Sequence, residues 1–316
     1  MLKKVRSLLL TGVISIGVVG CSSTNTNKVE DKIKVALVLS VGGVNDESFN
    51  QGAWEGALKA SQELGVDVSY LESNSDADYI QNIETAIDQE ADLVVGVGFQ
   101  VGNAILEAAK AYPEQSFAAI DSTYEEELDN LRSITFNEEE AGYLTGLIAA
   151  KMTKTNVVGW IGGLQIPSCE NFYWGFEEGA KEVNPDIKVL KQFTNSFTDA
   201  AKGRVVAQQM VSEDADIIFM AAGGGNAGAL EVVREKNIKA IGVDMPNNYL
   251  APEYIITSAL KNVGEGLKLT INDFINGEFT SGEVKYDLSN GGVGFEKTDL
   301  LSDEIIKYVE DKINNK

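Results

Sequence analysis

From Ile33 onward, short runs rich in β-branched residues alternate with longer stretches of helical periodicity. Most of the runs are largely apolar, which is typical of strands that are buried on both faces of a parallel sheet. A first series of expected strands lies near 33–39, 66–71, 92–97 and 116–120. Because helical patterns separate these runs, the sequence predicts an α/β fold in which helices cover both faces of a doubly wound sheet.

A second series of the same kind begins at 132–136 (RSITF) and continues through NVVGWI, IKVLKQF, DIIFMA and KAIGVD. Two series in one chain predict two lobes of similar build. We expect an N-terminal lobe over 33–133, to which roughly 260–288 returns, and a C-terminal lobe over 134–259, to which part of 289–316 can be added. In such a fold the strands of both lobes end at a shared cleft, where open α/β sheets bind ligands.

The N-terminus, MLKKVRSLLLTGVISIGVVGC, has basic residues followed by an apolar run. This run is shorter than the roughly 20 residues of a transmembrane helix and is typical of a secretory signal. The small residues before Cys21 resemble the lipobox of bacterial lipoproteins, and a polar segment follows that suits a tether. We expect a signal peptide at 1–20, a lipid such as palmitate on Cys21, a flexible tether within 21–32 and a place on the extracytoplasmic face of the cell membrane. The alternative is an ordinary signal that is cleaved near a cysteine.

Charge and residue usage exclude several functions. The 26 basic and 48 acidic residues give a formal net charge of −22, which repels nucleic acid and anionic lipid, so we exclude both as ligands. The chain has no histidine, which rules out His-dependent nucleophiles and His-ligated zinc. If Cys21 carries a lipid, Cys169 has no disulfide partner and is expected to be a small buried apolar residue. These absences remove several chemistries, and our leading expectation is no enzyme activity, no metal and no cofactor.

Gly223, Gly225 and Gly228 match the G-x-G-x-x-G pattern of dinucleotide-binding turns, between an expected strand and an expected helix. Asp244 closes the next expected strand, at about the twenty-residue offset of an acid that binds a ribose hydroxyl. A nicotinamide-dependent enzyme would also need a catalytic acid or base and an intracellular cofactor supply. We interpret the motif as a sugar-binding turn and keep an oxidoreductase as an alternative that absorbance of bound nicotinamide would reveal.

An aromatic residue follows a strand at the same type of turn in each series. Phe49 stands in the first turn of the helix after the first strand, and Phe197 stands just before a helix in TNSFTDAAKGR. Two such rings, one per lobe, can clamp a flat ligand, although each could also pack on its own helix. Asp121 and Asp244 end the runs FAAID and AIGVD, where a carboxylate accepts from hydroxyl or ring N–H donors, unless it caps a turn.

Asp46, Ser48 and Gln51 have a structural explanation in the turn GGVNDESFNQGAW. Asp46 or Ser48 can cap the following helix, and Ser48 with Gln51 fits a capping box. Asn50, which stands beside Phe49, is not explained in this way.

The segment GGVNDESFNQGAWEG resembles the signature of the basic membrane protein family, substrate-binding lipoproteins of ABC transporters that include purine nucleoside receptors. The resemblance extends over essentially the mature chain, through IGGLQIPSCENFYWGFEEGA, NSFTDAAKG, AAGGGNAGALEVVRE, IGVD and ITSALKN. It implies a type I periplasmic-binding-protein fold, in which two lobes joined by hinge strands hold a nucleoside. Family members sandwich the purine between two phenylalanines that look like Phe49 and Phe197, and bind the ribose with residues that look like Asp244 and Lys261.

Three further positions belong to the site that the resemblance implies: Gly223 near the sugar, Asp121 facing the base and Asn50 beside the stacking ring. One position departs from the family. Ser40 ends the first strand, where many relatives carry an acidic residue. A carboxylate there binds a ring N–H or amino group, whereas a hydroxyl makes a weaker contact that can donate or accept. Ser40 therefore bears on base preference more than on nucleoside binding.

These features predict a receptor without enzyme activity that captures a nucleoside, with a purine favoured, by closure of its lobes and delivers it to an ABC permease for import. One alternative is the same fold with another small polar ligand, such as a sugar or a furanose. Another is a ligand-sensing surface lipoprotein that has no permease. We expect a monomer, because the two lobes must open and close.

Overall fold

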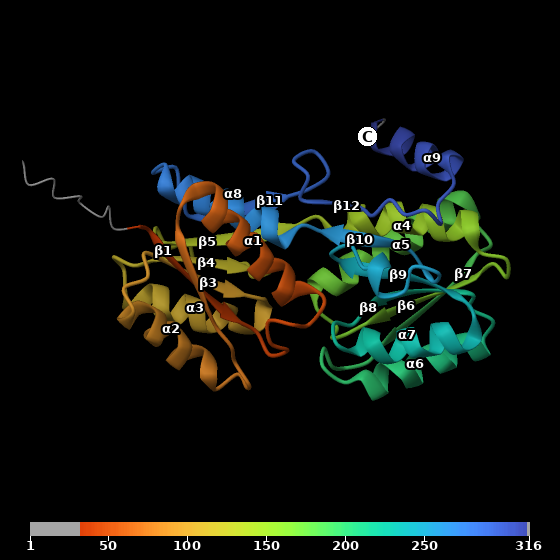
Figure 1. Cartoon of the computed structure of the whole chain (residues 1–316), viewed down its shortest axis with the longest axis horizontal. Coiled ribbons are helices and arrows are strands. Elements are labelled where there is room, and N and C mark those ends of the chain that lie inside the picture. The colour runs from red at the N-terminus through yellow and green to blue at the C-terminus, as the bar shows by residue number, and fades with distance from the viewer. Residues whose placement is uncertain (1–31, 315–316) are drawn as a thin grey trace, which may run out of the picture. The chain divides into compact units, whose positions relative to one another are not determined.

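The computed structural model of the protein describes residues 32–314. The predicted signal peptide at 1–20, Cys21 and nearly all of the predicted tether at 21–32 lie outside these residues. From Lys32 onward the chain forms one compact unit. This unit is built around two mostly parallel sheets, each covered by helices on both faces (Figure 1). We call each sheet with its helices a lobe. The predicted α/β fold with two doubly wound lobes is confirmed.

The sheet of the first lobe is parallel throughout the described strands. In spatial order these are β11 (Gly282–Tyr286), β5 (Leu131–Phe136), β4 (Ser116–Ile120), β3 (Leu93–Val97), β1 (Lys34–Leu39) and β2 (Asp67–Leu71). One face is covered by α1 (Phe49–Leu64) and α8 (Val263–Ile275), and the other by α2 (Asp78–Asp88) and α3 (Phe99–Ala111) (Figure 1). Alternate residues of β1 enter the two apolar cores: Leu37 belongs to the core beneath α1, and Val38 to the core beneath α2 and α3.

The sheet of the second lobe has the same build, except that β12 runs antiparallel to β10. In spatial order its strands are β12 (Val293–Phe295), β10 (Ile255–Lys261), β9 (Lys239–Asp244), β8 (Ile217–Ala221), β6 (Val157–Gly162) and β7 (Lys188–Phe193). One face carries α4 (Glu138–Met152) and α5 (Pro167–Val183), and the other carries α6 (Ala200–Ser212) and α7 (Gly225–Lys236). The short 3-10 helix η1 (Asn248–Leu250) follows β9, and α9 (Asp303–Asn314) packs against α4.

Glycines bring the backbones of α4 and α5 into contact. A Cβ on Gly175 would lie 1.9 Å from the carbonyl oxygen of Glu139, and one on Gly142 would lie 2.3 Å from that of Phe172. No larger residue fits at either glycine unless one of the helices moves. Gly175 and Gly179 therefore lie on the face of α5 that packs on α4.

The expected start of the second series at 132–136 is wrong. These residues belong to β5, which pairs in parallel with β4 and β11 in the first sheet. Leu131, Ile134 and Phe136 are buried, as they would be in a central strand of either lobe. The apolar pattern thus identifies a buried strand without saying which sheet receives it. The expected boundary between 133 and 134 cuts through β5, and the chain enters the second lobe only after this strand.

The chain passes between the lobes after β5, after β10 and after β11. Within 260–288, α8 and β11 lie in the first lobe, whereas β12 and α9, from the segment 289–316, lie in the second. These crossings place the ends of strands from both lobes around a common space. Among the described residues, none of the helices has the length and apolar character needed to span a membrane.

Candidate functional site

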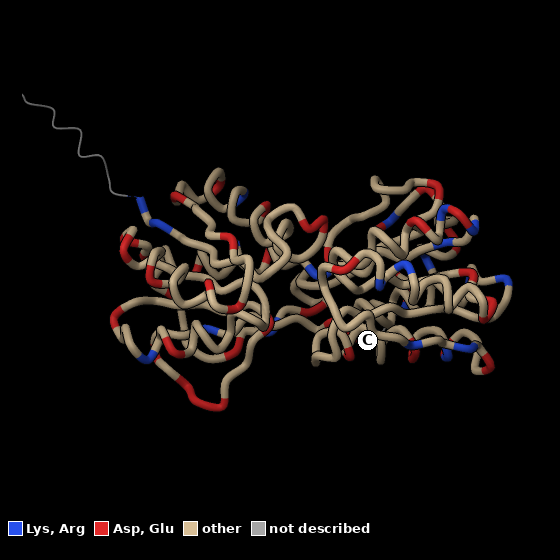
Figure 2. The backbone as a smooth tube through the Cα atoms, turned by 90° about the horizontal axis from the view of Figure 1, so that it is seen from below, with Lys and Arg blue, Asp and Glu red and all other residues tan. Residues whose placement is uncertain are grey.

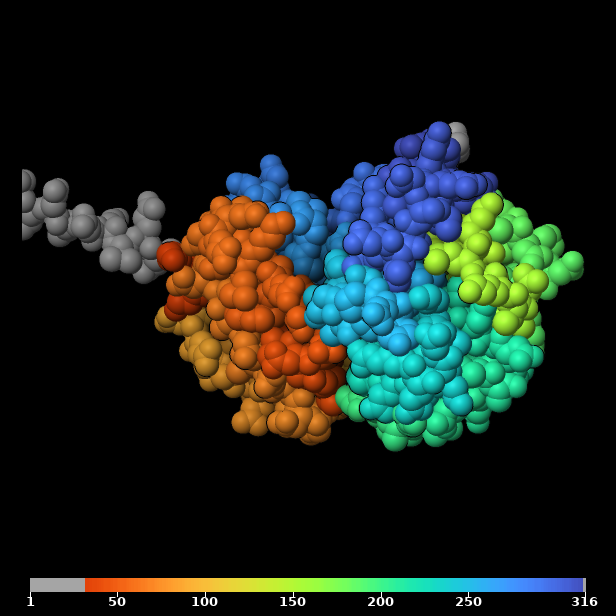
Figure 3. All heavy atoms as spheres, turned by 45° about the vertical axis from the view of Figure 1, so that its right-hand side comes forward, coloured from red at the N-terminus to blue at the C-terminus, as the bar shows by residue number. Residues whose placement is uncertain are grey.

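The loops at the carboxyl ends of strands from both lobes enclose a pocket of about 710 Å³, counting the part that is open to solvent. Figure 3 shows the furrow along which the surfaces of the two lobes meet. All eight residues predicted to bind a ligand line this pocket: Ser40, Phe49, Asn50, Asp121, Phe197, Gly223, Asp244 and Lys261.

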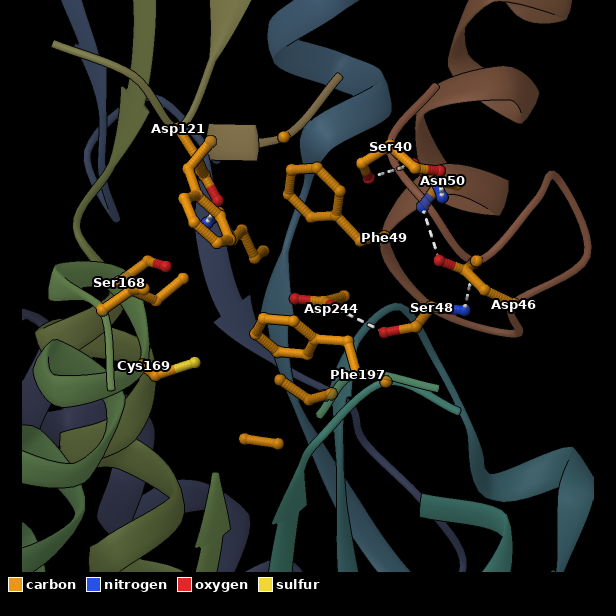
Figure 4. Close-up of a pocket in the computed structure, with 18 of the residues that line it drawn as sticks. Ser40, Asp46, Ser48, Phe49, Asn50, Asp121, Ser168, Cys169, Phe197 and Asp244 are labelled. Carbon is orange, nitrogen blue, oxygen red and sulfur yellow. Dashed lines mark hydrogen bonds and ion pairs between the residues drawn. The ribbon is translucent and has the colours of Figure 1, made fainter. Parts of the chain in front are cut away.

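The two predicted aromatic residues come from different lobes. Phe49 is the first residue of α1, and Phe197 lies in the loop between β7 and α6. Both side chains are half-buried and project into the pocket (Figure 4). A Cβ on Gly163 would lie 2.2 Å from the ring of Phe197, so the absence of a side chain there allows the ring to lie against the backbone. Phe99, at the start of α3, meets Phe197 edge to face with a centroid distance of 6.5 Å.

The glycines of the G-x-G-x-x-G motif have two different roles: one lines the pocket, and another allows two helices to pack closely. Gly223 lines the pocket and has a φ of +54°, a left-handed conformation that glycine adopts at no steric cost. Gly225 and Gly228 do not line the pocket: a Cβ on Gly228 would lie 1.8 Å from the carbonyl oxygen of Ala200. The last glycine therefore allows α7 to approach α6. Of the three glycines in the predicted sugar-binding turn, Gly223 alone lines the pocket.

Asp121 and Asp244 occupy matching positions in the two lobes. Asp121 directly follows β4 and Asp244 ends β9. Their φ angles of +62° and +66° are both left-handed, a conformation that aspartate tolerates better than most residues. In both cases the side chain reaches the pocket (Figure 4). The repeated fold thus presents two carboxylates to one cavity.

Lys261 connects the two lobes through buried charge pairs. It ends β10, is buried, and its Nζ lies 2.5 Å from Oδ2 of Asp121 and 2.8 Å from Oε1 of Glu138. Asn171 of α5 donates to the other oxygen of Glu138 at 3.2 Å. Oδ1 of Asp121 is buried without a hydrogen-bond partner among the described residues. This oxygen can accept a donor from a ligand that enters the pocket.

Burial dominates the pKa of the two aspartates, whereas neighbouring charges dominate that of Lys261. It raises the pKa of Asp121 to about 6, against the opposing attraction of Lys261. It also raises the pKa of Asp244 to about 6, although Lys261 and the Ser48 hydroxyl favour the carboxylate. For Lys261, burial alone would lower the pKa, but the surrounding carboxylates outweigh it and raise the pKa above the usual range. At neutral pH the pocket therefore holds two ionised aspartates around a protonated lysine.

The predicted capping box at Ser48 and Gln51 is wrong. Asp46 alone caps α1, since its carboxylate accepts from the backbone N–H groups of Ser48, Asn50 and Gln51 at 3.0, 2.9 and 3.1 Å. The side chain of Ser48 instead donates to Oδ2 of Asp244 at 2.5 Å and so joins the two lobes (Figure 4). A carboxylate is a stronger acceptor than a hydroxyl for helix N–H groups, which leaves Ser48 available to the pocket.

Cys169 lies in the wall of the same pocket and is buried. Burial raises the pKa of its thiol to about 12. The residue is therefore a neutral thiol at physiological pH, as expected for a small apolar cysteine.

Several residues of the site were missed by the sequence analysis. Phe99 and Gln100 open α3, which follows β3 after Gly98, as Phe49 opens the helix that follows β1. Their position at a strand-to-helix turn was the signal that could have identified them. Glu138 opens α4 after β5 and contributes through its contact with Lys261 rather than by lining the pocket. Ser168, at the start of α5, also lines the pocket and carried no such signal.

Residues 33–316 match the family model Bmp, described as ABC transporter substrate-binding protein PnrA-like. The chain belongs to this family. Over its full length it is 35% identical to the ABC transporter nucleoside-binding protein BmpA of Lactococcus lactis subsp. cremoris, of which it covers 98%. Over 98% of its length it is 37% identical to basic membrane protein A of Borreliella burgdorferi, of which it covers 93%.

Among solved structures, the chain is similar to an ABC transporter system solute-binding protein from Aeropyrum pernix K1. The TM-score is 0.78 and the identity is 32%, over 90% of this chain and 80% of the other. The predicted type I periplasmic-binding-protein fold and the resemblance to the basic membrane protein family are confirmed. The chain is thus an ABC transporter substrate-binding protein, a class that binds a ligand and works with a permease.

Proposed function

We propose that this protein is a nucleoside receptor that captures its ligand between the lobes and delivers it to an ABC permease for import. The observation that carries this proposal is the position of Phe49 and Phe197, one from each lobe, in the same pocket as Asp244 and Lys261. Two aromatic faces suit a planar base, and a carboxylate beside an ammonium group suits vicinal hydroxyls. One relative is named as a nucleoside-binding protein, which agrees with this chemistry.

The charges of the pocket favour a neutral ligand. Of the described residues that line it, Lys261 is the one cationic side chain, and it already contacts Asp121 and Glu138. Asp46, Asp121 and Asp244 supply carboxylates to the same lining. A phosphate group would meet repulsion from these carboxylates, so a nucleoside fits better than a nucleotide. The exterior is acidic as well, with Asp and Glu spread over both lobes (Figure 2).

We further propose that a lipid on Cys21 anchors the protein to the extracytoplasmic face of the cell membrane, and that it acts as a monomer without enzyme activity. The basic and apolar pattern of the first twenty residues supports this placement. So does the relative that is named as a membrane protein. The two lobes would move about β5, β10 and the segment after β11, where the chain crosses between them.

Isothermal titration calorimetry tests the ligand. The purified protein is unfolded and refolded to remove bound ligand, and is then titrated with adenosine, guanosine, inosine, cytidine and uridine. Ribose and galactose serve as controls for the same fold with a sugar as ligand. Tight binding of a nucleoside with no response to either sugar supports the proposal. Binding of a sugar and of none of the nucleosides would overturn it.

A further inference from the structure

The side-chain amide of Asn50 is buried at the wall of the pocket, and its orientation is settled by its neighbours. Its Nδ2 donates to the backbone carbonyl oxygens of Ser40 and Gly43 at 3.1 and 3.2 Å. Carbonyl oxygens only accept hydrogen bonds, so the nitrogen of the amide must be the atom that faces them. Oδ1 of Asn50 therefore faces the hydroxyl of Ser40, at 3.1 Å.

This arrangement fixes the direction of the Ser40 hydroxyl. Oδ1 of Asn50 only accepts, so the hydroxyl of Ser40 must donate its one hydrogen to it. Only the lone pairs of Ser40 Oγ remain for a ligand. A serine in a binding site can ordinarily donate or accept, but this serine can only accept.

The side-chain amide of Gln100 lies near the same corner as Ser40. Measured from the point that a Cβ on Gly98 would occupy, Ser40 Oγ lies at 2.9 Å and Oε1 of Gln100 at 3.5 Å. All three residues line the pocket. Gly98 has a φ of +102° and no side chain, which leaves this corner open. With the Gln100 amide oriented as in the structure, a group with two hydrogens, such as an amino group, can serve both oxygens, whereas a ring N–H has one hydrogen to give.

We propose that Ser40, oriented by Asn50, is a specificity-determining residue that accepts a hydrogen bond from an exocyclic amino group on the base of the ligand. This inference rests on the proposed function, because it takes the ligand to be a nucleoside. A base that presents a carbonyl or an unprotonated ring nitrogen to Oγ of Ser40 meets only its lone pairs. The acceptor atom of that base then loses its hydrogen bond to water and gains none from Ser40, which weakens binding.

The test compares nucleosides that differ by one amino group. The pairs are adenosine with purine riboside, guanosine with inosine, and cytidine with pyrimidin-2-one riboside. Calorimetry on the purified wild-type protein gives the affinity ratio within each pair that binds. The same ratios are measured for Ser40→Ala, and for Ser73→Ala as the matched control. Ser73 is a buried serine that follows β2 and does not line the pocket; 3% of its surface is exposed, against 6% for Ser40.

We expect the amino nucleoside of at least one pair to bind the wild type about 2- to 12-fold more tightly than its partner, the range for one neutral hydrogen bond. Ser40→Ala should bring that ratio close to one, while Ser73→Ala should retain it. Because each ratio is measured on a single protein, a general loss of stability cancels from it. A ratio near one in the wild type, or one that Ser40→Ala leaves unchanged, would overturn the inference while the proposed function stands. If no nucleoside binds, the proposed function fails and the inference fails with it.

Discussion

Replacing Lys261 with methionine tests the electrostatic account of the pocket. The substitution keeps an apolar stem of similar length and removes the ammonium group that lies 2.5 Å from Asp121 and 2.8 Å from Glu138. Both carboxylates are largely buried, and Asp244 is also affected by this charge. Removing one partner of a buried ion pair typically costs about 3–5 kcal/mol, because the remaining charge has neither water nor a counter-ion. We expect a loss of this size in the free energy of unfolding at about pH 8.

The loss should shrink as the pH falls. In the wild type, burial raises the pKa values of Asp121 and Asp244 in the folded protein to about 6. Protonation of these groups therefore stabilises the folded state at low pH, and this stabilisation is lost as the pH rises through about 6. Without Lys261 these pKa values rise further, and near pH 5.5 both carboxyls are mostly neutral. Lys261 itself stays protonated over this range, because its pKa is raised above the usual value. The loss in the free energy of unfolding caused by Lys261→Met should be smaller near pH 5.5 than at pH 8 by at least about 1.4 kcal/mol, the equivalent of one pKa unit.

Urea unfolding followed by circular dichroism measures both effects, since urea does not screen charges as guanidinium does. Lys268→Met is the matched control. Lys268 lies near the surface with Glu63 at 3.3 Å and Glu265 at 3.0 Å, and pairs of this kind contribute at most about 1 kcal/mol. A loss below about 1 kcal/mol for Lys261→Met at pH 8, or an equal loss at both pH values, would refute the reasoning.

The remaining predictions concern the ligand and the anchor. Phe49→Ala and Phe197→Ala should each weaken nucleoside binding by about 2- to 12-fold or more, the stacking contribution beyond area burial. Phe279→Ala, whose ring packs on Arg132 away from the pocket, should not change affinity, and wild-type affinity in both pocket variants would rule out the sandwich. Asp244→Ala should reduce the affinity for ribonucleosides more than for their 2′,3′-dideoxy analogues in calorimetric titrations, and equal losses would argue against a ribose contact. Cys21→Ala should abolish metabolic labelling with a fatty acid and release the protein from the membrane fraction; continued labelling would contradict the lipoprotein prediction.

The site was predictable where a residue's place on its strand decided its role. Asp121 and Asp244 stand at strand ends, Phe49 and Phe197 stand in the turns between a strand and the next helix, and parallel sheets bring such turns to one edge. This reasoning holds for each lobe because the two lobes repeat the same build. Applied more widely, it would also have included Phe99, which opens α3 directly after β3.

Features that depend on which of two groups makes a contact, or on which sheet receives a strand, were not predictable from the sequence. Ser48 fits the capping pattern as well as Asp46 does, and only the three-dimensional arrangement shows that Asp46 takes all the cap hydrogen bonds. The sheet that receives β5 was equally undetermined, because a buried strand has the same apolar pattern in either lobe. The pairing of Lys261 with Glu138 joins residues that are distant in the sequence, and no local pattern indicates it.

A crystal structure with the most tightly bound nucleoside tests the central claim most directly. The account predicts the base between the rings of Phe49 and Phe197, with the ribose hydroxyls on Asp244 and Lys261. A nucleoside bound outside this pocket, or one whose base contacts neither ring, would contradict it.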